Sequence, residues 1–488
     1  MAITLLIIVL SSILIYRKFE HKLSKKRYHP VGGTILDHLI NFKRLHHYMT
    51  DLASKYKTYR LITPFPSEVY TSDPANVEYI LKTNLENYGK GWYNYSILKD
   101  LLGDGIFAVD GDKWREQRKV SSFEFSARAL RDVSSIIFTE NAVKLANIVS
   151  ESLVSNQPMD IQDLFMKSTL DSIFRVAFGV ELDSLCGSNE EGARFSRAFD
   201  DASAITAWRY VDILWKIKKA LNIGLEAKLK ENIRIVDDFV YKLIHRKIEQ
   251  MEQCQDDCVD LKKQDILSRF LKLSEADPKY LRDIILNFVM AGKDTTATTL
   301  SWFFYMLCKH LLVQEKAAQE IKESMGSKIS NGIKNISEFA ASLSEEALEK
   351  MHYLHAALTE TLRLYPPVPV DPKMCLSDDT MPDGFHVKKW DIVAYQPYAM
   401  GRMKLIWGDD AEEYKPERWI DENGCFRQES PFKFTAFQMK IISAVLLRFF
   451  VFKLSDESKA VKYRTMINLH VDGGLSVGAV QRSDHNPT

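Results

Sequence analysis

The sequence predicts a mainly α-helical domain with a small β region, placed behind an amino-terminal membrane anchor. Three observations predict it. Apolar residues recur at i, i+3, i+4 and i+7 through most of residues 37–310, most clearly at 127–154, 226–252 and 280–310. Runs of β type are short and few, at 58–63, 68–71, 385–387 and 391–395. An uncharged apolar run opens the chain.

The anchor is predicted at residues 1–16. As a helix this run spans roughly 24 Å, slightly less than the ~30 Å hydrocarbon core of a bilayer. Residues 17–27 then hold six basic residues and one acid, and basic flanks stay on the cytoplasmic side. A cleaved signal peptide usually has its charge before the apolar run and a small-x-small site after it, and neither is seen. We therefore expect an uncleaved anchor, a basic and Pro/Gly linker over residues 17–36, and a cytosolic domain over 37–488.

Composition excludes several classes of protein. Lys and Arg together number 65, as do Asp and Glu, so the chain has no net positive charge to attract a nucleic acid. Hydrophobic residues make up 46%, as in ordinary globular proteins. The six cysteines form no C-x-x-C pair, which argues against a disulfide framework or a zinc ribbon. Cys254 and Cys258 lie closest together, in a polar stretch that favours unpaired surface thiols.

Residues 291–296 read Ala-Gly-Lys-Asp-Thr-Thr in the middle of a long apolar helix. Gly costs a helix interior about 1 kcal/mol relative to Ala, and Thr can bond back to the preceding turn and bend it. One interpretation is a local opening that lines a cavity, in which Asp294 and Thr295 deliver protons to a bound oxidant. The other is a helix with a polar stripe.

Glu360 and Arg363 share one face of a second helix, which Pro366 and Pro367 end. The run Pro-Glu-Arg-Trp follows at residues 416–419. We expect Arg418 to join the other two as a buried charge triad that fixes the register of the fold more than its stability.

Trp114 and Arg118 lie one helical turn apart, so both can reach one anionic group. The alternative for this pair is a surface cation–π contact.

These four motifs, in this order and behind an anchor, resemble the cytochrome P-450 family of haem-thiolate monooxygenases. The resemblance covers residues 30 to about 480. The wording Asn-Tyr-Gly-Lys-Gly at 87–91, Leu-Gly-Asp-Gly-Ile-Phe at 102–107 and the run 398–410 are similar to the plant long-chain fatty-acid ω-hydroxylase branch.

The resemblance implies haem b as cofactor, bound by Trp114, Arg118, Ala291 and Gly292, with Asp294 and Thr295 as catalytic residues. It also implies a long-chain fatty acid as substrate and electrons from NADPH-cytochrome P-450 reductase. The implied location is the endoplasmic reticulum membrane, with the catalytic domain facing the cytosol.

One family motif is missing. A Phe-x-x-Gly-x-Arg-x-Cys-x-Gly loop should supply the thiolate ligand of the iron. Here residues 431–438 lead up to that loop, and Met439 continues with the later part of the next helix. The gap between Gln438 and Met439 corresponds to roughly fifteen residues.

No Cys follows Cys425, so the sequence assigns no axial ligand to the iron. Cys425 is the candidate for a substitute ligand. The sequence on both sides of the gap is intact and in frame, which is typical of a skipped exon, an alternative transcript or a gene-model error. We expect the helix after Met439 to dock short or shifted. The alternative function is a catalytically inactive, haem-deficient variant, which would be a membrane-tethered non-enzyme.

Overall fold

The structure is a computed structural model that describes residues 30–63, 67–124, 134–187, 190–253, 266–273, 277–326, 335–427 and 437–482. The predicted anchor at 1–16, the basic stretch at 17–27, Cys254 and Cys258 lie outside the described residues. Within the described ranges no helix has the length and apolar character needed to cross a membrane.

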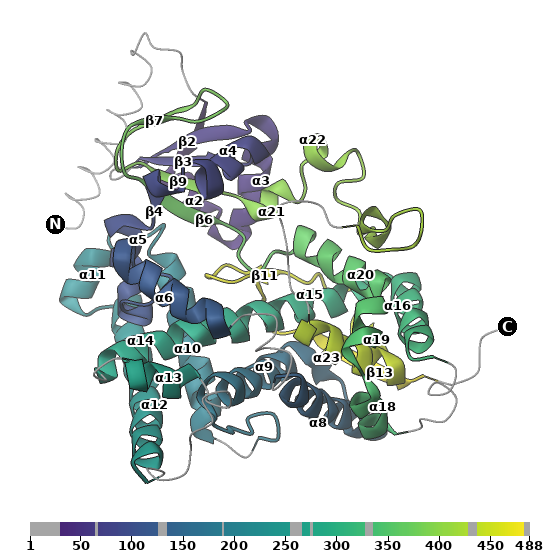
Figure 1. Cartoon of the computed structure of the whole chain (residues 1–488). Helices are drawn as coiled ribbons and strands as arrows, with labels where there is room; N and C mark the ends of the chain where they lie inside the picture. The colour runs from purple at the N-terminus through teal and green to yellow at the C-terminus, as the bar shows by residue number, and fades with distance from the viewer. Residues whose placement is uncertain are drawn as a thin grey trace.

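Helices make up most of the described chain (Figure 1). The α-helices are α2 (Ile35–Ile40), α3 (Leu45–Lys55), α4 (Pro74–Glu78), α5 (Gly91–Leu102), α6 (Gly111–Glu124), α8 (Ser134–Ser155), α9 (Ile161–Phe178), α10 (Glu190–Trp208), α11 (Trp215–Leu221), α12 (Leu225–Gln253), α13 (Ile266–Leu273), α14 (Pro278–Val289), α15 (Thr295–Lys309), α16 (Leu311–Ser324), α18 (Ile336–Ser342), α19 (Glu345–Lys350), α20 (His352–Leu364), α21 (Pro397–Met400), α22 (Lys404–Trp407) and α23 (Phe437–Phe449). Tight 3-10 turns are η1 (Phe42–Arg44), η3 (Leu85–Asn87) and η6 (Pro416–Trp419), and wide π turns are η2 (Tyr79–Thr83) and η5 (Met290–Asp294).

The strands form a mixed six-stranded sheet and smaller sheets. They are β1 (Val31–Thr34), β2 (Thr58–Ile62), β3 (Glu68–Thr71), β4 (Tyr88–Gly89), β5 (Met159–Asp160), β6 (Asp371–Cys375), β7 (Asp379–Thr380), β8 (His386–Val387), β9 (Ile392–Tyr395), β10 (Phe450–Leu454), β11 (Tyr463–Arg464), β12 (His470–Val471) and β13 (Ser476–Gln481). The large sheet has the order β1-β2-β3-β9-β6-β4, parallel at β1/β2 and β3/β9 and antiparallel elsewhere. An antiparallel sheet has the order β10-β13-β5.

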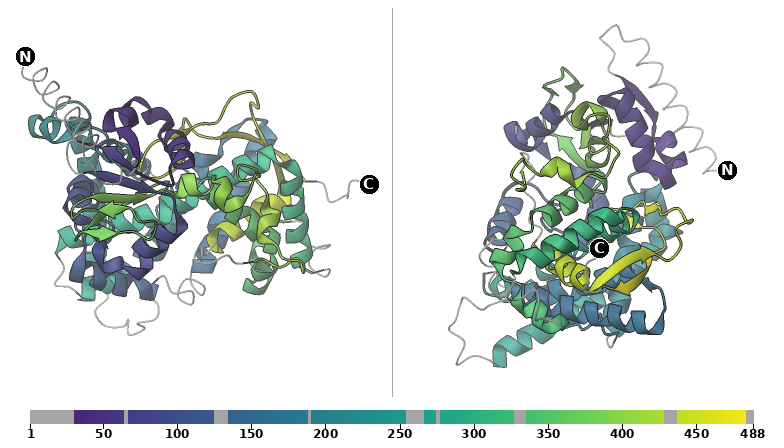
Figure 2. Two further views of the ribbon diagram at one scale, coloured as in Figure 1. Left: turned by 90° about the horizontal axis from the view of Figure 1, so that it is seen from above. Right: turned by 90° about the vertical axis from the view of Figure 1, so that its right-hand side faces the viewer.

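The large sheet lies to one side of the helical body, which both views of Figure 2 also show. Through the middle of that body run α14, η5 and α15. Almost all of α15 is buried, including Trp302, Phe303 and Phe304. A helix that is buried on nearly all sides belongs in a core, and the main core cluster contains apolar residues of α15 together with residues of α8, α9, α16, α20 and α23.

Capping explains where two of these helices begin. The Asp160 carboxylate accepts hydrogen bonds from the backbone N–H of Gln162 and Asp163 at the start of α9. Asp277 does the same for Lys279 in α14, whose first residue is Pro278. Both are N-cap arrangements that satisfy otherwise unpaired amides.

Most predicted elements are confirmed. Helix α12 matches the prediction at 226–252, and α14, η5 and α15 match 280–310 with one wide turn in the middle. The strands predicted at 58–63, 68–71, 385–387 and 391–395 appear as β2, β3, β8 and β9. The prediction missed β1, β6 and the whole β10-β13-β5 sheet.

The expectation that the helix after Met439 docks short or shifted stays a prediction. Helix α23 runs from Phe437 to Phe449. Met439, Ile442 and Leu446 are buried in the main core cluster. These apolar side chains therefore hold the helix in the core.

Candidate functional site

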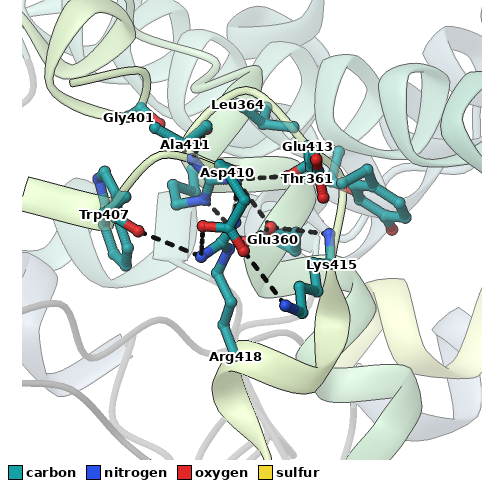
Figure 3. A network of polar contacts seen from close by, with 12 residues as sticks. Glu360, Thr361, Leu364, Gly401, Trp407, Asp410, Ala411, Glu413, Lys415 and Arg418 are labelled. Carbon is teal, nitrogen blue, oxygen red and sulfur yellow. Dashed lines mark hydrogen bonds and ion pairs between the residues drawn. The ribbon is translucent and has the colours of Figure 1, made fainter. Parts of the chain in front are cut away.

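The charge triad predicted from the sequence forms between α20 and η6, and its side chains are largely buried (Figure 3). Glu360 on α20 is completely buried, and its carboxylate pairs with Arg363 at 2.7 Å and with Arg418 of η6 at 3.2 Å. The Arg363 side chain is 2% exposed and the Arg418 side chain 13%. A buried ion pair needs further hydrogen bonds to offset the loss of water.

The backbone around the triad supplies those hydrogen bonds. Arg363 donates to the carbonyl oxygens of Gly401, Ala411 and Glu413. The Glu360 carboxylate also accepts the backbone N–H of Lys415 and, at 2.9 Å, the indole N–H of Trp419. The triad therefore fastens three stretches of the irregular segment after residue 400 to one helix.

The long helix contains a π turn, η5, Met290–Asp294, at the position where an opening was predicted. Such turns occur mostly as single bulges within α-helices, frequently at functional sites. The Thr295 hydroxyl donates to the Ala291 carbonyl at 2.6 Å, as expected for a threonine that bonds back to the preceding turn. A Cβ on Gly292 would lie 2.7 Å from the Ile173 side chain, so the glycine allows α9 to approach the turn.

Asp294 is buried, and its partners were not predicted. Its carboxylate contacts the Lys293 ammonium at 2.9 Å and accepts from the Asn468 amide at 3.1 Å. Lys293 is also buried and reaches Asp200 on α10 at 2.6 Å. Burial alone lowers the pKa of Lys293, but Asp200 and Asp294 outweigh it and hold that pKa above its usual value. The lysine therefore stays charged between two carboxylates.

Trp114 and Arg118 both lie on α6, where Trp114 is half-buried and Arg118 is exposed. The cation over the Trp114 ring is Lys90, at 4.9 Å. Burial, reinforced by the charge of Lys373, lowers the pKa of Lys90 to about 8. The structure thus adds Lys90 to the predicted pair as a further cation beside the indole.

The described cysteines do not fit a haem-thiolate site. Cys375 is buried in β6, where its Sγ donates to the Ser377 carbonyl and burial raises the pKa of the thiol to about 11. Cys308 lies near the end of α15, and burial raises its pKa to about 12. Cys186 and Cys425 are exposed. None of these four combines a stabilised thiolate with a place in a closed pocket.

The start of α23 offers no other sulfur ligand that fits. Met439 is buried in the core, and the neighbouring Lys440 ammonium donates to the Leu348 carbonyl at 2.8 Å. Haem-thiolate chemistry needs an anionic sulfur donor. The residues present in the described part of this chain therefore do not complete a haem site.

A cavity of about 870 Å³ opens beside the long helix. Its walls come from η1, α10, the start of α12, α15 and the segment around β11. Its lining residues are Phe42, Lys43, Arg44, His47, Asp201, Ala204, Ile205, Trp208, Leu225, Lys228, Trp302, Tyr365, Tyr398, Val461, Lys462, Tyr463, Arg464, Thr465 and Asp472. No sequence motif marked this cavity, because its walls are brought together from segments far apart in the chain.

Replacing Glu360 with Ala should lower the free energy of unfolding by about 3–5 kcal/mol, because Arg363 would be left buried without a carboxylate and Arg418 would keep only Asp410. Urea denaturation followed by circular dichroism measures this. The matched control is Glu346→Ala, which breaks an exposed pair with Lys350 and should change stability by no more than about 0.5 kcal/mol. Equal stability of the two variants would rule out a structural role for the triad.

Replacing Lys293 with Met should also cost about 3–5 kcal/mol, because the Asp294 carboxylate would be left buried without its cation. Adding Asp294→Asn should recover part of that loss in the same denaturation experiment. Lys279→Met, at an exposed lysine of α14, is the control and should stay within about 0.5 kcal/mol of the native chain. If Lys293→Met is as stable as this control, the buried ion pair of Lys293 with Asp294 does not stabilise the fold.

Comparison with known proteins identifies the family of this chain. The cytochrome P450 family model matches residues 25–461. Cytochrome P450 704C1 of Pinus taeda is 51% identical over 484 residues, covering 93% of this chain and 92% of the relative. Cytochrome P450 704B1 of Arabidopsis thaliana is 42% identical over 518 residues, covering 97% and 98%. Cytochrome P450 94A1 of Vicia sativa is 37% identical over 402 residues, covering 81% and 74%.

The lengths of these alignments indicate that a relative has residues without a counterpart in this chain. Since 93% of 488 residues is about 454, an alignment of 484 positions with the pine protein leaves about 30 positions without a counterpart in this chain. The pine protein therefore has internal residues that this chain lacks. The match nevertheless spans nearly all of both proteins, and the chain belongs to the cytochrome P450 family, whose members are haem-dependent monooxygenases.

Proposed function

We propose that this fold serves ω-hydroxylation of long-chain fatty acids, with O2 and with electrons from NADPH-cytochrome P-450 reductase. We propose further that the haem-ligand loop is missing between Gln438 and Met439, so that the chain as it stands holds haem weakly or not at all. The observation that carries both is an intact triad and π turn in a chain with no Cys after Cys425.

The cavity supports an apolar substrate. Its buried wall includes Ile205 and Trp302, which are 7% and 2% exposed, and a hydrocarbon chain placed there would gain by leaving water. The cavity volume lies within the ~300–1,000 Å³ typical of small-molecule sites. The likeness of residues 87–91 and 102–107 to the fatty-acid ω-hydroxylase branch supports the substrate class.

The alternative, a membrane-tethered and haem-deficient non-enzyme, rests on the missing loop alone. The names of the relatives give it no support. The internal residues that the pine protein has and this chain lacks are consistent with a lost segment in an otherwise complete enzyme. Restoring the loop separates the two functions.

The reduced carbon monoxide adduct of the native 488-residue chain should lack the red-shifted thiolate band. Inserting a Gly-x-Arg-x-Cys-x-Gly loop between Gln438 and Met439 should produce that band and fatty-acid hydroxylation, because the iron would regain its anionic sulfur donor. The control carries the same loop with Ser in place of its Cys and should show no such band. A thiolate band from the native chain would overturn the proposal and make Cys425→Ser the next variant.

The proposed location, the endoplasmic reticulum membrane with the catalytic domain in the cytosol, rests on residues 1–27. Membranes washed with carbonate should retain the full chain and release much of a chain that starts at Tyr28, because the apolar run would be gone. Immunoblots of pellet and supernatant measure the difference. Equal retention of both chains would show that another surface binds the membrane.

A further inference from the structure

Glu68 of β3 is a buried carboxyl group without a counter-ion. The residue is 5% exposed, and it forms no ion pair with any residue that the structure describes. The Tyr70 hydroxyl donates a hydrogen bond to its Oε2 at 2.7 Å. Burial raises the pKa of Glu68 to about 7, and the hydrogen bond from Tyr70 offsets only part of that effect. A cation beside this group would favour its charged form.

Tyrosine rings from separate parts of the chain lie close to this carboxyl group. Tyr93 of α5 and Tyr210, which follows α10, meet edge to face at 71°, with ring centroids 6.3 Å apart. Burial raises the pKa of both hydroxyls, and the Glu68 carboxylate raises them further, together with Asp371 in the case of Tyr210. The rings of Tyr70, Tyr93 and Tyr210 are partly exposed, so a solute can reach them from water.

The other titratable groups at this place provide no cation for Glu68. Asp371 of β6, the second carboxylate facing Tyr210, is already paired with Lys373 at 2.9 Å. His38 packs edge-on against Tyr70, with ring centroids 5.4 Å apart. Burial lowers the pKa of His38 to about 4, so this histidine is neutral at pH 7. A positive charge that pairs with Glu68 therefore has to come from a ligand.

We infer that Glu68, Tyr70, Tyr93 and Tyr210 form a binding site for a quaternary ammonium group. Aromatic ring faces attract a cation that lies within about 6 Å of the ring centre, and clusters of such rings recognise quaternary ammonium ligands. The nearly perpendicular rings of Tyr93 and Tyr210 form two walls of a corner, and Glu68 supplies the opposite charge. Choline belongs to this chemical class, either as the free ion or as a lipid headgroup. The site is independent of the proposed hydroxylation and of haem.

Other cations match these groups less well. Calcium and magnesium ions need about six or more oxygen ligands. The described residues contain no group of three or more His, Cys, Asp or Glu that could hold a metal ion. A primary ammonium has three N–H donors, each of which needs an acceptor when it leaves water. A quaternary ammonium donates no hydrogen bond, so one carboxylate and several ring faces suffice for it.

Isothermal titration of the native chain with choline chloride, in a maltoside detergent that has no choline headgroup, tests the inference. The affinity for choline should rise about tenfold from pH 6 to pH 8, because the charged fraction of a carboxyl group with a pKa of about 7 rises by about that factor. Glu68→Gln should bind choline about tenfold more weakly than the native chain at pH 8 and should show no change with pH. Native affinity that does not change with pH would overturn the inference.

The folding of Glu68→Gln is measured in parallel by urea denaturation. This variant keeps the shape of the side chain and removes an unpaired charge, so it should be at least as stable as the native chain at pH 8. The raised pKa of Glu68 stabilises the native chain only while the group is protonated, so the stability advantage of the variant should grow as the pH rises through about 7. Saturating choline should reduce that advantage, because it binds the folded native chain.

A pair of substitutions at Tyr93 tests the role of the rings. Tyr93→Leu should weaken choline binding about fivefold, because it removes a ring face, whereas Tyr93→Phe keeps the ring and should bind as the native chain does. Glu338→Gln is the matched control for loss of a carboxylate, since Glu338 is exposed on α18, and it should bind choline unchanged. Equal choline affinity in Tyr93→Leu and Tyr93→Phe would overturn the inference.

Two further ligands identify the chemistry and its source. Ethanolamine, which carries a primary ammonium, should bind about fivefold more weakly than choline, and tighter binding of ethanolamine would overturn the assignment to a quaternary ammonium. Glycerophosphocholine is the soluble headgroup portion of phosphatidylcholine. Binding as tight as that of choline supports a lipid headgroup as the ligand, and weaker binding supports the free cation. Failure of the native chain to bind either choline compound at pH 8 would overturn the site itself.

Discussion

A carboxylate with no access to water, that of Glu360, organises the hydrogen bonds of the segment from Gly401 to Trp419. It is tolerated only because two guanidinium groups, a backbone amide and an indole N–H converge on it. Each of those donors except Arg363 belongs to the segment after residue 400, which has little regular structure of its own. The hydrogen bonds to Glu360 therefore hold this segment in place, as the regular backbone hydrogen bonds of a helix or sheet would do elsewhere.

The residues that hold α23 in the fold differ from those that would hold the cofactor. Helix α23 is buried by its own apolar face, and its Lys440 is paired with a backbone carbonyl. Neither contact involves a haem ligand. These contacts of α23 would therefore form without a cofactor loop, because hydrophobic burial is non-directional and proportional to area.

Much of the fold was predictable because it depends on local periodicity. Long helices such as α12 show their buried stripe in the sequence, and the triad was predictable from the Glu360 and Arg363 spacing ahead of a Pro-Pro exit, together with the later Pro-Glu-Arg-Trp run. The β10-β13-β5 sheet was not, since β5 has two residues and joins strands some 300 positions later. The contacts of Lys293 with Asp200 and of Asp294 with Asn468 were missed for the same reason, because no local pattern reports a partner on another element.

Two neighbouring residues of α10 connect the cavity to the π turn. Asp200 reaches inward to Lys293, whereas Asp201 reaches Lys228 and Arg464 at the cavity rim. Successive residues of an α-helix point about 100° apart, so one helix can present a carboxylate to each site. All three ion pairs join residues that the structure describes. Helix α10 therefore contacts both sites. Asp201 holds two cations at the cavity rim, and Asp200 holds the lysine that pairs with Asp294.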